Sequence, residues 1–334
     1  CLQVWRCVAP VAWRRTRCVT WNVPWIFSSL LVTRPGLFKP YAGPQDHCRR
    51  AAVGTSREKP GAHPLDQILS EVPVMKAIIL SAGQGTRLLP LTQSLPKCAI
   101  RVGKQALLDW QIDGLVANGI DHAVVVSGFG AQHVDHVLAK TGDRVQARTI
   151  YNPRFDTADN LVSCWMARNE MDDDFILLNG DTVFEPGVLA RLLEAAHRPV
   201  VMGIDHKAHY DDDDMKVQLR DGCLLRVGKD LPLEQVNGES IGMMVFRGDG
   251  PALFREALDR AVSCPGEQNR WYLSVIDRMA EAEMVWTQSI HGLGWAEIDY
   301  PMDLIRAAGM VNSWDRRAMD KISCRACAFH GWSA

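Results

Sequence analysis

The chain lacks both a long apolar run and a strong charge of either sign. No run of eighteen apolar residues occurs among its 334 residues, so the sequence predicts no transmembrane helix. Its 37 basic and 39 acidic side chains give a formal net charge of −2. This balance excludes the broad positive surface of a general nucleic-acid-binding protein. We therefore expect no nucleic-acid partner, and a site for phosphate groups has to be local.

Residues 1–74 lack acidic side chains before Asp46 and contain no methionine. They are rich in arginine and tryptophan, and no helix or strand period persists. Two interpretations compete: an Arg-rich targeting sequence, or translated upstream sequence with Met75 as the true start. We favour the second, because the segment is long and lacks amphipathic order. The predicted organisation is an atypical extension over 1–74, untranslated or disordered, one domain over 75–311, and a tail over 312–334.

The cysteines do not form the pattern of a disulfide framework. Cys98, Cys164, Cys223 and Cys264 are scattered singly through the middle of the chain. A chain of this size does not need disulfides for stability. We therefore expect these four to be reduced thiols in a cytoplasmic protein.

From Met75 the sequence alternates between apolar strands and helices. Strands are predicted over 76–81, 122–127, 147–151, 175–179 and 199–204, and helices over 105–118, 131–139, 159–169 and 186–197. This alternation predicts an α/β, Rossmann-like fold with a mostly parallel sheet and helices on both faces.

After residue 204 the alternation becomes less regular. A small antiparallel addition is predicted from strands over 215–219, 224–227 and 241–246, followed by helices over 251–262, 271–280 and 301–311 and a strand over 284–289. The four-carboxylate run at 211–214 is interpreted as a solvated loop.

The strongest functional signal is the segment 80–97, LSAGQGTRLLPLTQSLPK, directly after the first strand. Gly83 and Gly85 permit positive φ and close approach of the backbone to a ligand. Consecutive backbone N–H groups in such a turn form an anion site, and Arg87 and Lys97 add positive charge for a polyphosphate. The segment lacks the GK[ST] ending of a P-loop, and Leu88 stands in the place of the third glycine of the dinucleotide pattern.

Two other segments carry carboxylates that could bind a metal ion. Asp181 follows the buried strand 175–179, and ligands bind beyond the carboxyl ends of such strands. Glu297 and Asp299 fall on one face of a short extended segment before the helix opened by Pro301. Carboxylate oxygens suit Mg²⁺, although Asp181 could instead cap a turn, and the other two could be acids at a helix entry.

The pattern GxGTRLxPLT followed by PK resembles the signature of the nucleotidyltransferases that activate sugar phosphates and related small phosphoesters. The resemblance covers about residues 75–310. It implies that Arg87 and Lys97 hold the triphosphate and that Mg²⁺ is bound by Asp181 and a second carboxylate, for which we prefer Asp299 over Glu297. The nucleotide-binding residues that we expect are Ser81, Ala82, Gly83, Gly85, Thr86, Ser127, Gly128, Asn179 and Gly180.

Three further features together resemble the bacterial CTP:phosphocholine cytidylyltransferases and their aminoethylphosphonate-activating relatives. They are DNL at 159–161 with Ser163 and Trp165, DMKV at 214–217, and GESIG at 238–242. Lys216 could bind and align the acceptor phosphate. Glu239 and Trp165 could hold a cationic amine, and Asn160 is the fourth residue expected at the acceptor. Each of these residues taken alone is more often structural.

The resemblance implies Mg²⁺-dependent transfer of a nucleotidyl group, a cytidylyl group from CTP, to a small phosphorylated acceptor. Phosphocholine and aminoalkylphosphonates are the acceptors expected, with release of pyrophosphate. Such an acceptor is already anionic, so catalysis would rest on positioning and charge neutralisation, with Arg87, Lys97 and Lys216 as the catalytic cations. The sequence leaves open whether the chain forms a homo-oligomer.

Three alternatives remain at this point. One is a hexose-1-phosphate nucleotidyltransferase that uses UTP or dTTP. Another is a non-catalytic, nucleotide-binding regulatory homologue, which we would expect to have lost a phosphate-binding cation or a metal-binding carboxylate. The third is a nicotinamide-dependent oxidoreductase, which would require an acidic ribose ligand after the second strand, where Ser127, Gly128 and Phe129 stand.

Overall fold

The computed structural model describes residues 75–314. The predictions for the extension 1–74 and for residues 315–334 of the tail lie outside the described residues. Within 75–314, no helix is long and apolar enough to cross a membrane. The four cysteines of this part are free, and Cys98, Cys164 and Cys223 are buried.

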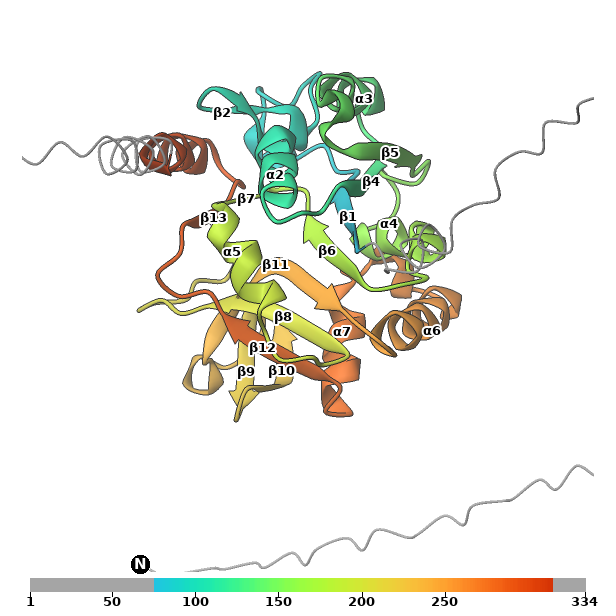
Figure 1. Cartoon of the computed structure of the whole chain (residues 1–334). Helices are drawn as coiled ribbons and strands as arrows, with labels where there is room; N and C mark the ends of the chain where they lie inside the picture. The colour runs from blue at the N-terminus through green and yellow to red at the C-terminus, as the bar shows by residue number, and fades with distance from the viewer. Residues whose placement is uncertain (1–74, 315–334) are drawn as a thin grey trace, which may run out of the picture. The chain divides into compact units, whose positions relative to one another are not determined.

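A nine-stranded mixed sheet runs through the described part of the chain (Figure 1), in the order β5-β4-β1-β6-β11-β8-β12-β10-β9. Its strands are β1 (Lys76–Ser81), β4 (His122–Ser127), β5 (Gln146–Tyr151), β6 (Phe175–Asn179), β8 (Val200–Asp205), β9 (Lys216–Arg220), β10 (Cys223–Gly228), β11 (Gly238–Phe246) and β12 (Val285–Ser289). Strands β5, β4, β1 and β6 are parallel, as are β8 and β12.

The predicted α/β class is confirmed, but the antiparallel part does not lie only at the periphery. Strand β11 is inserted between β6 and β8 and runs antiparallel to both. Every residue of β11 is buried. A strand buried on both faces needs neighbours on both edges for its backbone hydrogen bonds, which explains its central place.

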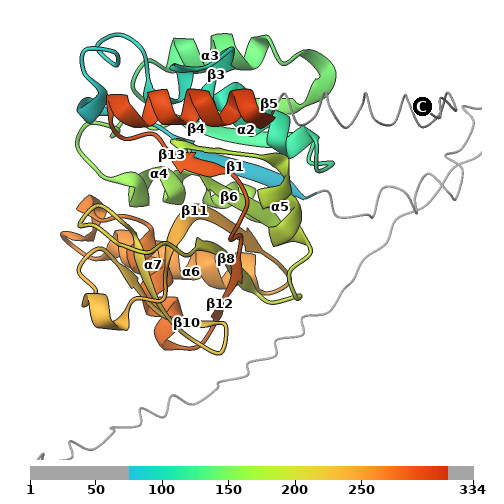
Figure 2. The same ribbon diagram turned by 90° about the vertical axis from the view of Figure 1, so that its left-hand side faces the viewer.

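Helices cover both faces of the sheet, as predicted (Figures 1 and 2). One apolar cluster joins one face to α2 (Leu107–Val116), α3 (Ala131–Ala139) and α5 (Pro186–Leu193). A second cluster joins the other face to α4 (Asn160–Met166), α6 (Gly250–Ser263) and α7 (Leu273–Glu281). Along β1, Ala77 and Ile79 enter the first cluster whereas Ile78 and Leu80 enter the second, as expected from the alternation of side chains in a strand.

A separate two-stranded sheet joins segments that are far apart in the sequence. Strand β7 (Thr182–Phe184) follows β6 after a turn at Gly180 and Asp181, and pairs antiparallel with β13 (Trp295–Glu297). The N–H of Ile298 donates to the carbonyl of Asp181 at 3.0 Å. This pairing fixes the end of β13 beside the end of β6. A further short hairpin consists of β2 (Arg101–Val102) and β3 (Gln105–Ala106).

The helix that follows β13, red in Figure 2, extends over residues 301–314 and so continues beyond the predicted end at Val311. Trp314 is buried and packs edge-on against Trp110 of α2, with ring centroids 6.1 Å apart. The indole of Trp110 also donates to the carbonyl of Val102 at 2.8 Å. This packing anchors the segment after β13 to the helices above the sheet.

Candidate active site

The glycine-rich loop after β1 packs closely against the side chain of Lys97. It leads into the 3₁₀ helix η1 (Thr86–Leu88), and Lys97 opens a second one, η2 (Lys97–Ala99). Gly85 has a φ of 77°, and a Cβ at this position would lie 2.9 Å from Cβ of Lys97. The hydroxyl of Thr92 donates to the Gly85 carbonyl at 2.8 Å. Glycine is therefore required at position 85 both by the backbone conformation and by the close approach of Lys97.

The ammonium of Lys97 lies between two carboxylates that come from distant segments. Its Nζ is 3.0 Å from Oδ2 of Asp181 and 2.5 Å from Oδ1 of Asp299. The other oxygen of Asp299 pairs with Nη2 of Arg87 at 3.0 Å. Burial lowers the pKa of Lys97, but its attraction to Asp181 and Asp299 outweighs this effect, so the pKa is raised and the ammonium stays charged.

Asp181, Glu297 and Asp299 have the geometry and chemistry to share a divalent ion. Their ligand atoms all lie within 4.8 Å of one another. Oδ1 of Asp181 is buried and has no hydrogen-bond partner among the described residues. Carboxylate oxygens are the ligands that Mg²⁺ prefers, and an orphaned buried oxygen has free capacity for a ligand. The donor set therefore fits the predicted Mg²⁺.

The surroundings of Glu297 disfavour its negative charge. Burial, followed by repulsion from Asp181 and Asp299, raises the pKa of Glu297 to about 8. The residue is nevertheless exposed to solvent. A divalent cation at this position would act in the opposite direction and favour the charged form.

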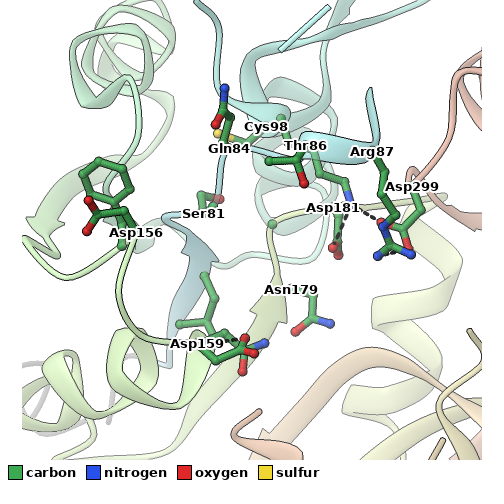
Figure 3. A pocket seen from close by; sticks show the side chains of 17 residues that line it. Ser81, Gln84, Thr86, Arg87, Cys98, Asp156, Asp159, Asn179, Asp181 and Asp299 are labelled. Carbon is green, nitrogen blue, oxygen red and sulfur yellow. Dashed lines mark hydrogen bonds and ion pairs between the residues drawn. The ribbon is translucent and has the colours of Figure 1, made fainter. Parts of the chain in front are cut away.

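Arg87, Lys97, Asp181 and Asp299, but not Glu297, line a cavity of about 550 Å³ beyond the carboxyl ends of β1 and β6 (Figure 3). In Figure 3, Arg87, Asp181 and Asp299 lie together, and Asp156 and Asp159 lie on the opposite side. The lining residues are Leu80, Ser81, Gly83, Gln84, Gly85, Thr86, Arg87, Lys97, Cys98, Phe155, Asp156, Asp159, Asn160, Asn179, Gly180, Asp181 and Asp299. Most of the residues predicted to bind nucleotide are among them.

Three of the predicted nucleotide-binding residues do not line this cavity. Ala82 lines a smaller cavity of about 140 Å³ that shares Gly83 and Phe155 with the first. Ser127 is buried at the end of β4. A Cβ on Gly128 would lie 2.5 Å from Cβ of Phe155, so this glycine permits close packing behind the cavity wall.

Two buried side chains that the motifs did not reveal hold the turn after β6. Nε2 of Gln111 donates to the carbonyls of Asn179 at 2.7 Å and Thr182 at 2.9 Å. The hydroxyl of Tyr272 donates to Oδ1 of Asn179 at 3.0 Å. The available sequence signal was that the polar Gln111 stands at helical spacing from Leu107, Leu108 and Leu115, on the apolar face of the predicted helix 105–118. Gln111 thus holds the backbone on either side of Asp181, and Tyr272 holds the side chain of Asn179 at the end of β6.

Of the residues predicted to bind the acceptor, only Asn160 lines the cavity. Lys216 is buried, and its ammonium donates to the carbonyl of Lys229 at 2.8 Å. The indole N–H of Trp165 donates to Asp259 at 2.7 Å. These contacts satisfy Lys216 and Trp165 within the protein and do not support the predicted acceptor roles.

Glu239 is the remaining predicted acceptor residue, and it is the buried member of a partly exposed ion cluster. Its carboxylate lies 2.8 Å from the ammonium of Lys207, which also pairs with Asp214 at 2.6 Å. Asp211 accepts the N–H groups of Asp213 and Asp214 at 2.9 and 3.2 Å. The run 211–214 is a loop with three exposed residues, as predicted, and Asp214 anchors it to Lys207.

A second cavity, of about 660 Å³, adjoins the first, and Asp159 lines both. It lies beside β10 and α7. Lys229 and Trp271 line it, with the ammonium 4.8 Å from the centroid of the indole ring. The two cavities together offer space for two ligands side by side.

Comparisons with known proteins agree with this geometry. Residues 76–202 match the family model described as nucleotidyl transferase. The chain is 31% identical over 103 residues to the choline-phosphate cytidylyltransferase of Streptococcus pneumoniae, covering 31% of this chain and 43% of that protein. It is 30% identical over 243 residues to the CMP-5'-(3-aminopropyl)phosphonate synthase of Streptomyces rubellomurinus, covering 70% of this chain and 38% of that protein.

The chain thus spans less than half the length of these two relatives. A solved structure, the inositol-1-phosphate CTP transferase from T. maritima, aligns with 71% of this chain and 96% of its own. The TM-score is 0.61 at 21% sequence identity. At this identity the likeness shows that the two proteins share a fold.

Proposed function

We propose that the protein transfers a nucleotidyl group from a nucleoside triphosphate to a small phosphorylated acceptor and releases pyrophosphate. The match of residues 76–202 to the nucleotidyl transferase family model supports this proposal. One observation carries the proposal. Lys97 bridges Asp181 and Asp299 at one end of a glycine-lined cavity, and Arg87 pairs with the outer oxygen of Asp299. A bound polyphosphate needs cationic side chains for its oxygens, and the divalent ion that accompanies it needs carboxylates. Both kinds of group are present at this end of the cavity.

The nucleotide in this proposal is CTP, and the acceptor is phosphocholine or an aminoalkylphosphonate. The two relatives described above support both choices, since one is a choline-phosphate cytidylyltransferase and the other a CMP-5'-(3-aminopropyl)phosphonate synthase. The cavity wall opposite Arg87 and Asp299 carries Asp156 and Asp159 (Figure 3). These acids suit an acceptor with a positive charge at its far end.

In the proposed reaction, the residues of this chain bind and orient two anions. Arg87 and Lys97 neutralise the charge that develops on the departing pyrophosphate, and their positions are fixed before the reaction by Asp299 and Asp181. The acceptor oxygen is already anionic, so it needs no general base. Asp181 and Asp299 would hold Mg²⁺, with Glu297 within reach. A bound Mg²⁺ would supply charge neutralisation at the reacting phosphates.

The proposal is tested by pyrophosphate release with each of four nucleoside triphosphates and each of three acceptors: phosphocholine, 2-aminoethylphosphonate and glucose 1-phosphate. We expect the highest kcat/KM with CTP and an amino-bearing acceptor, and loss of activity when Mg²⁺ is chelated. Activity confined to glucose 1-phosphate with UTP or dTTP would instead support a hexose-1-phosphate nucleotidyltransferase. Nucleotide binding without pyrophosphate release from any pair would support a regulatory homologue.

A further inference from the structure

Asp213 in the acidic run has three partners that come from three separate parts of the chain. Its Oδ2 lies 3.0 Å from Nη1 of Arg87 and accepts the hydroxyl of Tyr300 at 2.8 Å. Its Oδ1 lies 3.1 Å from the ammonium of Lys229. The Tyr300 hydroxyl, followed by the Lys229 ammonium, lowers the pKa of Asp213, so this carboxyl is charged at neutral pH.

Asp213 belongs to a turn that is held by hydrogen bonds within it and by an ion pair of Asp214. Asp214 pairs with Lys207 at 2.6 Å, and the N–H of Asp211 donates to Oδ2 of Asp214 at 2.6 Å. The N–H of Asp213 itself donates to Asp211. Asp213 is therefore held toward Arg87 by a built turn, although its own side chain is 45% exposed.

Asp213 links one cation from each of the two cavities. Its partner Arg87 lines the first cavity, and its partner Lys229 lines the second. A guanidinium, an ammonium and a phenol hydroxyl converging on the two oxygens of one carboxylate form a receptor for an oxyanion. A phosphoryl group offers more oxygens and more charge than a carboxylate, so it is the stronger ligand for the same donors.

We propose that Arg87, Lys229 and Tyr300 form an oxyanion site that Asp213 fills from within the chain and that a phosphoryl group of a substrate takes over. The incoming group displaces Asp213 and frees the tip of the turn 211–214, while Lys207 still holds its base. Asp213 thereby competes with the ligand and sets the affinity of the site. The inference rests on the proposed function, since that reaction supplies two phosphoryl ligands: the polyphosphate of the nucleotide and the phosphate of the acceptor.

Calorimetric titration tests the competition directly, without turnover. Wild type, Asp213→Asn and Asp212→Asn are each titrated with CTP in the presence of Mg²⁺, with pyrophosphate and with phosphocholine. Asp212 is the matched control, because it has the same charge in the same turn and takes part in none of the three contacts of Asp213. The pairs of Asp213 are partly exposed and so individually weak, and we expect Asp213→Asn to bind its phosphoryl ligand about three- to tenfold more tightly than wild type does.

The ligand that gains affinity identifies the source of the phosphoryl group. A gain for CTP and pyrophosphate assigns the site to the polyphosphate, and a gain for phosphocholine assigns it to the acceptor. Lys229→Met in the Asp213→Asn background should weaken that same ligand about three- to tenfold, and Lys229→Arg should restore it. Thermal melts check that these variants remain folded.

Equal changes in Asp213→Asn and Asp212→Asn would overturn the inference, because they would show a long-range effect of net charge. Unchanged affinities in Asp213→Asn would overturn it as well. In both cases pyrophosphate release by the wild type would leave the proposed function standing. Wild-type protein that binds none of the three probes and releases no pyrophosphate would contradict both.

Discussion

The ends of β1 and β6 can be compared with the antiparallel strands β9, β10 and β11. The two regions differ in whether their charged side chains have hydrogen-bond partners within the protein. At the first place, Asp181 keeps a buried oxygen without a hydrogen-bond partner. At the second, Arg226 forms a two-pronged pair with Asp277 at 2.9 and 3.1 Å, and the ammonium of buried Lys216 is satisfied by a carbonyl. Buried polar groups are normally satisfied, so the orphaned oxygen of Asp181, in a cavity beside other carboxylates, is available to a ligand. The contacts of Arg226 and Lys216 instead hold the antiparallel strands together.

The largest effect that this comparison predicts is that of Asp181→Asn. The substitution keeps the shape of the side chain but removes the charge that faces Lys97 and the proposed metal ion. We expect turnover to fall by about 10²- to 10³-fold or more, as for other preorganised electrostatic groups. Steady-state pyrophosphate release measures it, with Asp212→Asn as the control of equal charge. Turnover within about threefold of wild type would remove Asp181 from the metal site.

The next largest effect is expected from Gly85→Ala. An alanine here combines an unfavourable φ of 77° with a contact of 2.9 Å to Lys97, so the lysine has to move. We expect turnover to fall by about 10- to 100-fold, since a small misplacement of a charged group is costly in catalysis. Initial rates at saturating substrates measure this loss.

Gly119 offers a control that separates backbone strain from the displacement of Lys97. Its φ is 76°, and a Cβ there would meet nothing within 4 Å. Gly119→Ala should therefore lower the free energy of unfolding by about 1 kcal/mol while turnover stays within about twofold of wild type. An equal loss of turnover in both variants would show that strain alone, without movement of Lys97, accounts for the effect.

The parallel half of the fold and the cationic end of the cavity followed from contiguous sequence. The strands 76–81, 122–127 and 175–179 and the helix 131–139 have the predicted bounds. The glycine loop and its two cations lie within one short segment, so local spacing was sufficient to place them. The resemblance to nucleotidyltransferases on this segment is confirmed by the family match over 76–202.

The remaining features depend on contacts between distant segments, and no local pattern records such contacts. The pairing of β7 with β13 brings Asp299 beside Asp181, and Gln111 reaches the turn after β6 from another helix. For Lys216, the type of side chain indicated a phosphate ligand. Its actual partner is the backbone carbonyl of Lys229. Every residue carries a carbonyl, so the sequence does not indicate this partner. It is chosen by the geometry of the chain at the end of β10.

Lys216→Met tests whether a satisfied cation belongs to the scaffold. The variant leaves the carbonyl of Lys229 without its donor, and we expect the free energy of unfolding to fall by about 1–3 kcal/mol. The KM for the acceptor should change by less than about threefold, because the ammonium is already engaged. Urea unfolding and acceptor titrations measure the two quantities. A KM raised tenfold or more in a protein of unchanged stability would restore Lys216 as the acceptor ligand.

The smallest effect is expected from Glu239→Gln, and it concerns the dependence of stability on pH. Burial raises the pKa of Glu239 from 4.5 to about 7 in the folded protein, because it outweighs the attraction of Lys207, and repulsion from Asp214 adds a smaller increase. The folded state therefore holds this proton more tightly than the unfolded state does, and the resulting stability is fully present below pH 4.5 and is lost as the pH rises toward 7. Glutamine does not titrate, so the variant should lack this decline, and relative to wild type it should gain about 1 kcal/mol between pH 5 and pH 8 in urea unfolding. Parallel stability curves for the two proteins would show that Lys207 keeps Glu239 charged throughout, which would make the cluster beneath the turn 211–214 a permanent ion pair.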